Sequence, residues 1–567
     1  MKFLCVLCVL CGVFSHAAAL DRNAFTITKY HLTATVDPEQ QRLGVRGVIT
    51  LRNDSSSPQK NLSLQISSTL DWKSIQFEKQ PVQFLTHGYT SDIDHTGELS
   101  EAIVTLPREI KPQEIIELWI GYEGTIALNA TRLTRIGVSE AEARHTDWDQ
   151  VSSTFTAVRG IGYVVWYPVS TEAASLSEGN SVEETVGRWK QRHAGSEMDV
   201  LFESNVNKAI LFSGNTNLAE VNTPADIVKI ADFGMSRFGT DVPTFVMTDH
   251  PKLVVDANAS IYYSPGHEEI AKSLSKQIGD LNNFISPYFR GAAGIEVFDN
   301  PDTAAGSFSS AQLLIVPLKV APEQETKLTL IYALIHSKLY CRHAWMQEGL
   351  VHYTQVEYLE QQSGRQAALD YLSAHQQELA DAEKQNTQSA HEKPQDADDQ
   401  SLLNGIDDIQ FQAKAMRVWW MLHDMLGTNV NIPLLLYDYK FSDDQSADYI
   451  QKLIQGKTHR DLQWFFDDWV YHDRGLPDFR IASVYPSRLP TGGYLITVTV
   501  ENLGAAGAEV PVTVKIPTGD VTQRLQVLGK SKNSIRFEVP TVPQQVTVND
   551  GSVPESDMSN NTFIVKQ

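Results

Sequence analysis

Hydrophobic and polar side chains alternate with a period of two from about residue 22 to residue 215. Alternate side chains of a β-strand lie on the same face, so this pattern predicts strands with one buried face. Turn-forming pairs such as Asp-Pro and Asn-Asp separate the runs. The apolar run 162–168 is predicted to be a later strand ending at Pro168. We therefore predict an N-terminal β-sandwich over residues 20–220. Its clearest strand has a face made of Tyr30, Leu32, Ala34 and Val36.

The period becomes helical from about residue 255 to residue 475, which predicts a mainly helical middle domain over residues 221–478. The later of two apolar helical stripes, over residues 415–426, ends at Gly427, and Gly commonly ends helices. The polar stretch of about residues 380–402 has little to bury, so we predict a mobile surface insertion there. The first helical stripe consists of Leu328, Ile331, Ile335 and Leu339.

Period-two alternation returns after residue 478, in short runs separated by Gly, Pro and Asn. This pattern predicts an immunoglobulin-like β-sandwich over residues 479–567. The whole chain is thus expected to be a multidomain α+β protein. Several oxygen-bearing side chains near its end are of the type that binds Ca²⁺, although turn chemistry explains them equally well. These residues are Asp550, Glu555, Asp557, Asn560 and Asn561.

The first 19 residues have the features of a cleavable signal peptide: one positive charge, an apolar run and an Ala-x-Ala site ending at Ala19. We therefore expect a secreted or periplasmic protein, without a stable membrane anchor after cleavage. Only Cys341 remains in the mature chain, so no internal disulfide is expected. The formal net charge of −22 argues against nucleic-acid binding.

Residues 332–336 and Glu348 carry the most informative chemistry. In the zinc-peptidase motif H-E-x-x-H, two His bind Zn²⁺ from one helix face, and the Glu activates a water molecule. His336 stands at the second His position, and Glu348 is a candidate third ligand. Tyr332 replaces the first His, and Ala333 replaces the catalytic Glu. Ala cannot act as a general base, so the first question is whether the chain is an enzyme at all.

Three segments give the chain a resemblance to the aminopeptidase N-like gluzincins, a family of zinc metallopeptidases. Residues 166–168 are similar to an aromatic-Pro signature, and residues 345–353 resemble the zinc-ligand helix W-L-x-E-G-x-A-x-Y. Residues 464–477 resemble the end of the catalytic domain. The resemblance covers roughly residues 25 to 480. It implies a saddle-like N-terminal β-sandwich, a thermolysin-like helical domain and a following β-sandwich.

The resemblance also implies that other functional positions have been lost. The family's G-A-M-E-N loop aligns with residues 306–310, which puts Ser309 where a Glu binds the substrate amine. Gln412 stands where a Tyr stabilises the oxyanion, and an amide donates differently from a phenol. The His336-to-Glu348 spacing is shorter than in the main family. A chance match would not keep the scaffold while losing base, ligand, amine anchor and oxyanion donor together.

His336 and Glu348 are the residual metal-ligand candidates, and two ligands hold Zn²⁺ poorly. We expect zinc to bind weakly or not at all. His352, four residues after Glu348 on the same helix face, is a candidate replacement for the lost ligand; the alternative is a histidine that only supports the site. Tyr332 is expected to fill the metal space and to hydrogen-bond His336 or Glu348.

Taken together, these residues favour an exported pseudopeptidase that binds a peptide or protein partner through the former substrate cleft. An active zinc metallo-aminopeptidase with an atypical ligand set is the first alternative, and it needs a replacement base. A structural envelope protein without an open cleft is the second.

Overall fold

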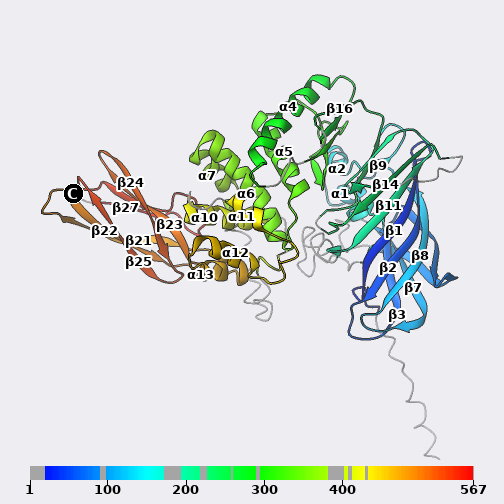
Figure 1. Ribbon diagram of the computed structural model, residues 1–567, viewed down its shortest axis with the longest axis horizontal. Coiled ribbons are helices and arrows are strands. Elements are labelled where there is room, and N and C mark those ends of the chain that lie inside the picture. Colours follow the sequence, from blue (N-terminus) through cyan, green and yellow to red (C-terminus); the bar gives the residue numbers. More distant parts are fainter. Residues whose placement is uncertain are drawn as a thin grey trace, which may run out of the picture.

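The computed structural model describes residues 20–89, 98–170, 193–217, 227–239, 241–256, 259–288, 294–377, 379–380, 401–405, 411–427 and 432–565. The predicted signal peptide and nearly all of the predicted insertion, residues 381–400, lie outside these ranges. The protein is a mixed α+β structure of several sheets and helices. Figure 1 shows strands at both ends of an elongated molecule and the helices between them.

The N-terminal strands form an eight-stranded sheet and a three-stranded sheet that share one core. The large sheet has the order β13-β14-β11-β1-β2-β8-β4-β5, and β1 pairs with β11 in parallel. Tyr30, Leu32, Ala34 and Val36 of β1 are all buried, which confirms the predicted face. The large sheet comprises β1 (Phe25–Asp37), β2 (Arg42–Asn53), β4 (Leu70–Phe77), β5 (Gln80–Pro81), β8 (Ile115–Thr125), β11 (Glu197–Ser204), β13 (Asn215–Thr216) and β14 (Lys229–Met235). The small sheet comprises β3 (Gln59–Ser67), β6 (Gln83–Tyr89) and β7 (Leu99–Ile110).

A four-stranded sheet and three short helices complete this region. Its order is β12-β15-β10-β9. The predicted boundary at residue 220 falls between β13 and β14, which pair with each other, so the N-terminal sheet continues beyond it. The elements are β9 (Gln150–Val151), β10 (Thr156–Val158), β12 (Ala209–Phe212), β15 (Phe245–Thr248), α1 (Thr131–Thr134), α2 (Glu140–Thr146) and the 3-10 turn η1 (Gly162–Val164).

The predicted strand over residues 162–168 is wrong. The segment begins with the η1 turn at Gly162, whose φ is +61°, and continues without regular structure. Val164, Val165, Trp166 and Tyr167 are all buried, so the run is apolar because it is surrounded on every side. The Trp166 indole Nε1 donates to the Pro243 carbonyl at 2.7 Å. A continuous apolar run does not by itself distinguish a buried strand from other buried backbone.

A five-stranded sheet, with α4 inserted between β17 and β18, belongs to the region that was predicted to be mainly helical, and the helical pattern did not reveal it. Its order is β16-β17-β18-β20-β19, with β19 on the edge. Its central strands are short and almost wholly buried, so they lack the alternation that reveals a half-exposed strand. The strands are β16 (Lys252–Val254), β17 (Ser260–Tyr262), β18 (Glu296–Asp299), β19 (Phe308–Ser310) and β20 (Leu313–Val316).

The helices pack into one core with this sheet and with the C-terminal strands. α10 ends at Gly427, whose φ is +59°, which confirms the predicted helix end. The helices are α4 (Glu268–Ile285), α5 (Glu323–Lys338), α6 (Ala344–Ser363), α7 (Arg365–Ala374), α10 (Met416–Leu426), α11 (Ile432–Asp438), α12 (Tyr449–Thr458) and α13 (Gln463–Phe466). Two π-helical turns are η4 (Phe411–Ala415) and η6 (Asp467–Tyr471).

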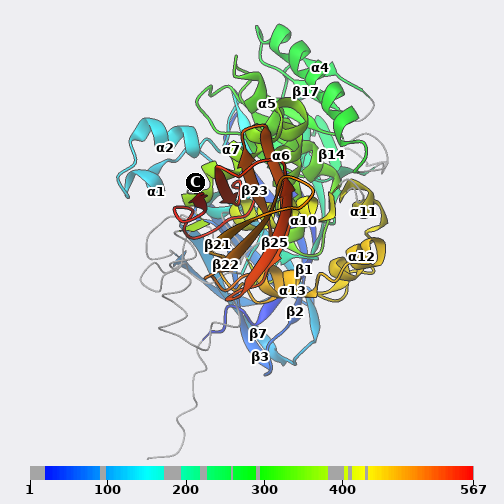
Figure 2. The ribbon, with the colours of Figure 1, turned by 90° about the vertical axis from the view of Figure 1, so that its left-hand side faces the viewer.

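The C-terminal strands form sheets of three and four strands, ordered β21-β22-β25 and β24-β23-β26-β27. Figure 2 views the molecule with these strands toward the reader and the helices behind them. Asp424 of α10 accepts hydrogen bonds from Arg365 and Arg524, at 2.8 and 3.0 Å, and so ties the helices to β24. The strands are β21 (Phe479–Arg488), β22 (Tyr494–Asn502), β23 (Ala508–Ile516), β24 (Gly519–Val527), β25 (Lys532–Val539), β26 (Gln545–Val548) and β27 (Thr562–Ile564).

No helix in the described ranges combines the length and the apolar character of a membrane span.

Candidate functional site

Two neighbouring helices bring the degenerate motif together. α5 carries Tyr332, Ala333 and His336, and α6 carries Glu348 and His352. His336 Nε2 lies 2.9 Å from Glu348 Oε1, and the Tyr332 hydroxyl donates to Glu348 Oε2 at 3.2 Å. We call this group, Tyr332 with His336 and Glu348, the His336–Glu348 site. Both carboxylate oxygens of Glu348 are therefore engaged by α5.

The Tyr332 ring covers the imidazole of His336. The two rings are stacked, with centroids 5.4 Å apart and planes 23° apart. The ring of His352 also contacts Tyr332, with centroids 5.5 Å apart and planes tilted by 50°. Ala333, the position of the catalytic Glu in the motif, is buried in the helical core. Its methyl group supplies no proton acceptor.

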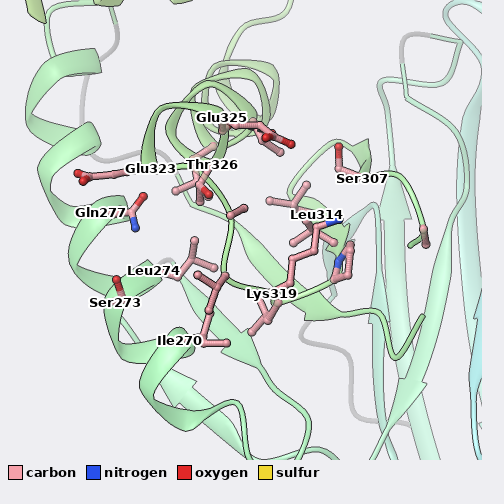
Figure 3. A pocket seen from close by; sticks show the side chains of 18 of the residues that line it. Ile270, Ser273, Leu274, Gln277, Ser307, Leu314, Lys319, Glu323, Glu325 and Thr326 are labelled. Atoms are coloured by element: carbon pink, nitrogen blue, oxygen red, sulfur yellow. Dashed lines mark hydrogen bonds between the residues drawn. The ribbon is translucent and has the colours of Figure 1, made fainter. Parts of the chain in front are cut away.

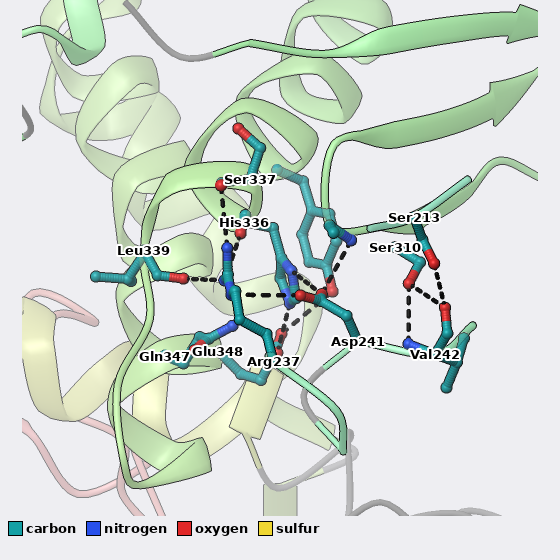
Figure 4. Close-up of polar contacts among 12 residues, drawn as sticks. Ser213, Arg237, Asp241, Val242, Ser310, His336, Ser337, Leu339, Gln347 and Glu348 are labelled. Atoms are coloured by element: carbon teal, nitrogen blue, oxygen red, sulfur yellow. Dashed lines mark hydrogen bonds and ion pairs between the residues drawn. The ribbon is translucent and has the colours of Figure 1, made fainter. Parts of the chain in front are cut away.

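Two further residues belong to the site and were not predicted from the sequence. Asp241 is fully buried, with Oδ1 3.3 Å from His336 Nδ1 and Oδ2 3.3 Å from Arg237 Nε. Arg237 also donates to the carbonyl oxygens of Ser337, His336 and Leu339 at the end of α5. Figure 4 shows this guanidinium between Asp241 and the last turn of α5. A basic side chain is favourable there because the helix ends in unpaired carbonyl groups.

The segment that carries Asp241 is fixed to the sheet. The Ala311 amide donates to Asp241 Oδ1 at 2.9 Å, and the Val242 amide donates to Ser310 Oγ at 2.9 Å. Ser310 is the last residue of the edge strand β19. The edge strand and α5 are therefore joined through Asp241, which fixes the orientation of the His336 ring.

The charge around His336 favours its protonated form. Burial alone would lower the pKa of this imidazole, but the carboxylates of Glu348 and Asp241 outweigh burial and raise the pKa to about 9. Each ring nitrogen faces one carboxylate. This arrangement therefore favours the protonated imidazole, and a histidine that binds a metal must first lose that proton.

The remaining predicted positions lie elsewhere around the helices. Ser309 sits on β19, paired with Leu314, and its buried hydroxyl has no hydrogen-bond partner among the described residues. Gln412 lies in η4, where its Nε2 is 3.5 Å from His375 Nε2. Within the described part of the chain, neither residue forms a hydrogen bond or ion pair with His336 or Glu348. The oxyanion and amine positions implied by the resemblance thus keep polar side chains of another chemistry.

His352 makes its clearest hydrogen bond to an amide. Its Nδ1 lies 3.1 Å from Gln355 Oε1, and Tyr371 donates to the same oxygen at 3.2 Å. His343 lies away from this group, with Nε2 3.6 Å from Asp444. These contacts place His352 beside the site and His343 outside it.

The donor set can be tested for zinc on these contacts. His336 Nε2 and a Glu348 oxygen could face one ion, but a phenol stands where the motif has its first His. Catalytic zinc uses three protein ligands and structural zinc uses four. Within the described ranges, no group of three His, Cys, Asp or Glu side chains is arranged to hold a metal ion. Of the three ligands of the zinc-peptidase motif, His336 and Glu348 remain at this site.

The acidic cluster near the C-terminus is engaged internally. Glu555 accepts hydrogen bonds from the Phe479 amide and from the side chains of Asn549 and Asn561. Asp557 accepts the Ser559 amide at 2.8 Å, as in a turn. Turn and network chemistry therefore accounts for the contacts of these residues.

Comparisons with known proteins add to this geometry at the level of the fold. By sequence, no family model matches the chain, and no curated protein matches it. By structure, it is similar to aminopeptidase A of Legionella pneumophila, solved with aspartic acid, with a TM-score of 0.60 and 11% identity over 94% of this chain and 59% of that one. It is also similar to native yeast LTA4 hydrolase, with a TM-score of 0.50 and 12% identity over 81% of this chain and 70% of that one.

The chain has an aminopeptidase fold. At these identities the likeness concerns the fold alone, so any activity has to be argued from the site itself.

Proposed function

We propose that this chain is an exported aminopeptidase-like protein that does not hydrolyse peptides and binds a peptide or protein partner through the face corresponding to the substrate cleft. The carrying observation is the Tyr332 hydroxyl hydrogen-bonded to Glu348, with its ring stacked on His336. Tyr332, at the position of the first metal-binding His, thereby contacts both remaining ligand candidates, His336 and Glu348. Under this proposal zinc is weak or absent, and the base is missing at Ala333.

We also propose the domain types that the sequence pattern and the resemblance to gluzincins imply. The N-terminal sheets correspond to the saddle-like β-sandwich, and the β16–α13 region corresponds to the thermolysin-like domain. The C-terminal sheets correspond to an immunoglobulin-like module that acts as a spacer or docking surface. Export rests on the signal-peptide pattern of residues 1–19.

Metal analysis tests the loss of the zinc site. After dialysis against a mild chelator, the purified protein should carry well under one zinc per chain. The double variant Tyr332→His/Ala333→Glu restores the motif and should raise the zinc content, because His and Glu are the residues that the motif uses. Ala333→Glu alone should not. If the double variant folds but binds no more zinc than the parent, the alignment of Tyr332 with the first metal His is wrong.

Peptide binding tests the proposed partner-binding function. Peptides selected from a random library should include a group that loses affinity in His352→Ala, whose ring lies against Tyr332. His343→Ala is the matched control, since His343 pairs with Asp444 outside the site. If no library peptide binds, or if both variants bind like the parent, the proposed binding function is refuted.

A further inference from the structure

A cavity of about 840 Å³ opens between α4 and the N-terminal half of α5. The loop of residues 304–307 and the loop that follows β20 close its other sides. Figure 3 shows Leu274 and Gln277 extending from α4 toward α5. The volume is within the range of small-molecule binding sites. The residues of the His336–Glu348 site do not line it: α5 gives this cavity residues up to Leu330, and Tyr332 begins the site.

The floor of the cavity is aliphatic. Leu274, Leu314, Leu318 and Leu330 are buried in the core and line the cavity with their side chains. Val320 lies at the mouth and is 94% exposed, which extends the apolar surface outward. A ligand with aliphatic side chains would remove its own apolar surface from water by packing on this floor.

The rim carries charges of both signs. Lys276 and Asp280 of α4 and Glu325 of α5 line the cavity and are exposed. None of the three forms an ion pair with a residue in the described ranges. The other rim charges have partners, such as Glu323 with Lys327 at 2.6 Å. Lys319 donates to the Thr303 carbonyl at 3.1 Å and likewise forms no ion pair within the described ranges, so two ammonium groups and two carboxylates are left to face a ligand.

Gln277 supplies the most specific signal. Its Oε1 is buried in the cavity wall and accepts no hydrogen bond from any described residue. A buried acceptor without a donor is destabilising. The Gln277 side chain is only partly buried, so a change of its rotamer brings this oxygen to a ligand N–H group, whereas a pure hydrocarbon ligand offers no such group.

We propose that this cavity binds a short peptide with free termini and aliphatic side chains. Its ammonium and amide N–H groups meet Gln277 Oε1 and the Glu325 carboxylate, and its carboxylate meets the Lys276 ammonium. Its side chains cover Leu274, Leu314 and Leu318. The same chemistry in the middle of a longer chain would lack the terminal charges, so capped and uncapped peptides distinguish the two sources.

Calorimetric titration with trileucine, triglycine and N-acetyl-trileucine amide tests the proposal. The wild-type protein should bind trileucine at least about tenfold more tightly than triglycine, since burial of each Leu side chain favours binding. The capped peptide should bind several-fold more weakly than trileucine. Equal binding of trileucine and triglycine, or no binding of trileucine, overturns the proposal. Equal binding of capped and uncapped peptide overturns the part that requires free termini.

Two variants tie the binding to this cavity. Ser273→Trp fills the cavity from its exposed wall and should weaken trileucine at least about tenfold, because the ring takes the place of the ligand's apolar contacts. Asn283→Trp adds the same ring to an exposed position of α4 outside the cavity and should bind like the parent. Lys276→Ala, which removes only an exposed charge, should weaken trileucine but not its capped form. Unchanged trileucine binding in both Ser273→Trp and Lys276→Ala overturns the assignment to this cavity.

Discussion

Replacing Asp241 with Asn removes the charge that joins the site to the sheet. In the native protein this buried carboxylate lies 3.3 Å from both His336 Nδ1 and Arg237 Nε, and it accepts the Ala311 amide at 2.9 Å. Asn has nearly the same shape and can still accept the amide. The variant therefore isolates the electrostatic contribution of Asp241.

The expected loss of stability follows from these contacts. Removing one partner of a buried ion pair costs about 3–5 kcal/mol, because the other charge is left without compensation. Arg237 keeps its hydrogen bonds to the carbonyl groups at the end of α5, and the Asn side chain keeps the bond to Ala311. We therefore expect the lower end of this range, about 3 kcal/mol.

Urea unfolding followed by tryptophan fluorescence and circular dichroism measures the change. Asp280→Asn is the control, because this exposed carboxylate has no ion pair among the described residues, and its effect should stay within about 0.5 kcal/mol. If Asp241→Asn lowers the free energy of unfolding no more than Asp280→Asn does, the ion pairs of Asp241 with His336 and Arg237 do not stabilise the fold.

The double variant Asp241→Asn/His336→Gln separates the two partners of Asp241. Contacting residues of one ion-pair network are not additive, and their coupling is typically 0.5–3 kcal/mol. The loss in the double variant should therefore be smaller than the sum of the two single losses by about 1 kcal/mol or more. Strict additivity would mean that Asp241 acts through Arg237 alone.

Two other substitutions make independent predictions. Burial raises the pKa of Glu357 to about 7, so its contribution to stability is complete below pH 4.5 and is lost as the pH rises through 7. Glu357→Gln should therefore stabilise the protein by roughly 1–3 kcal/mol at pH 8.5 and leave its stability unchanged at pH 4.5. Urea titrations at both pH values measure this difference. A Cβ at Gly349 would lie 2.9 Å from Ala415 Cβ and Trp419 Cδ1, both in the core. Gly349→Ala should therefore lower the free energy of unfolding by about 1–3 kcal/mol, measured by thermal unfolding. Gly279→Ala, which adds a Cβ in open space on α4, should raise it by about 0.5–1 kcal/mol.

Local pattern predicted much of the fold. The strand face of Tyr30 and Val36 and the helix end at Gly427 were readable because each depends on a periodicity or a residue with one preferred conformation. The five-stranded sheet β16-β17-β18-β20-β19 was not predicted, because strands of three or four buried residues show no alternation of polar and apolar side chains. Residues 162–168 were misread for the same reason: a run buried on all sides carries no period.

The site was predictable only where a motif marks it. Tyr332, His336 and Glu348 stand within one short stretch, and the structure brings them together. Asp241 and Arg237 come from a segment about 95 residues earlier, with no motif around them, and their role appears only when the fold places them under α5. Hydrogen bonds between residues distant in sequence cannot be read from composition or spacing.

Activity on aminoacyl reporter substrates tests the central claim most directly. The purified mature protein should release no reporter above background, with or without added zinc. The absent base at Ala333 alone is worth typically 10²–10⁴-fold, and Tyr332 replaces a metal ligand as well. Release of reporter that scales with protein concentration and stops on addition of a chelator would contradict the account, and would make the chain an active metallo-aminopeptidase with an atypical ligand set.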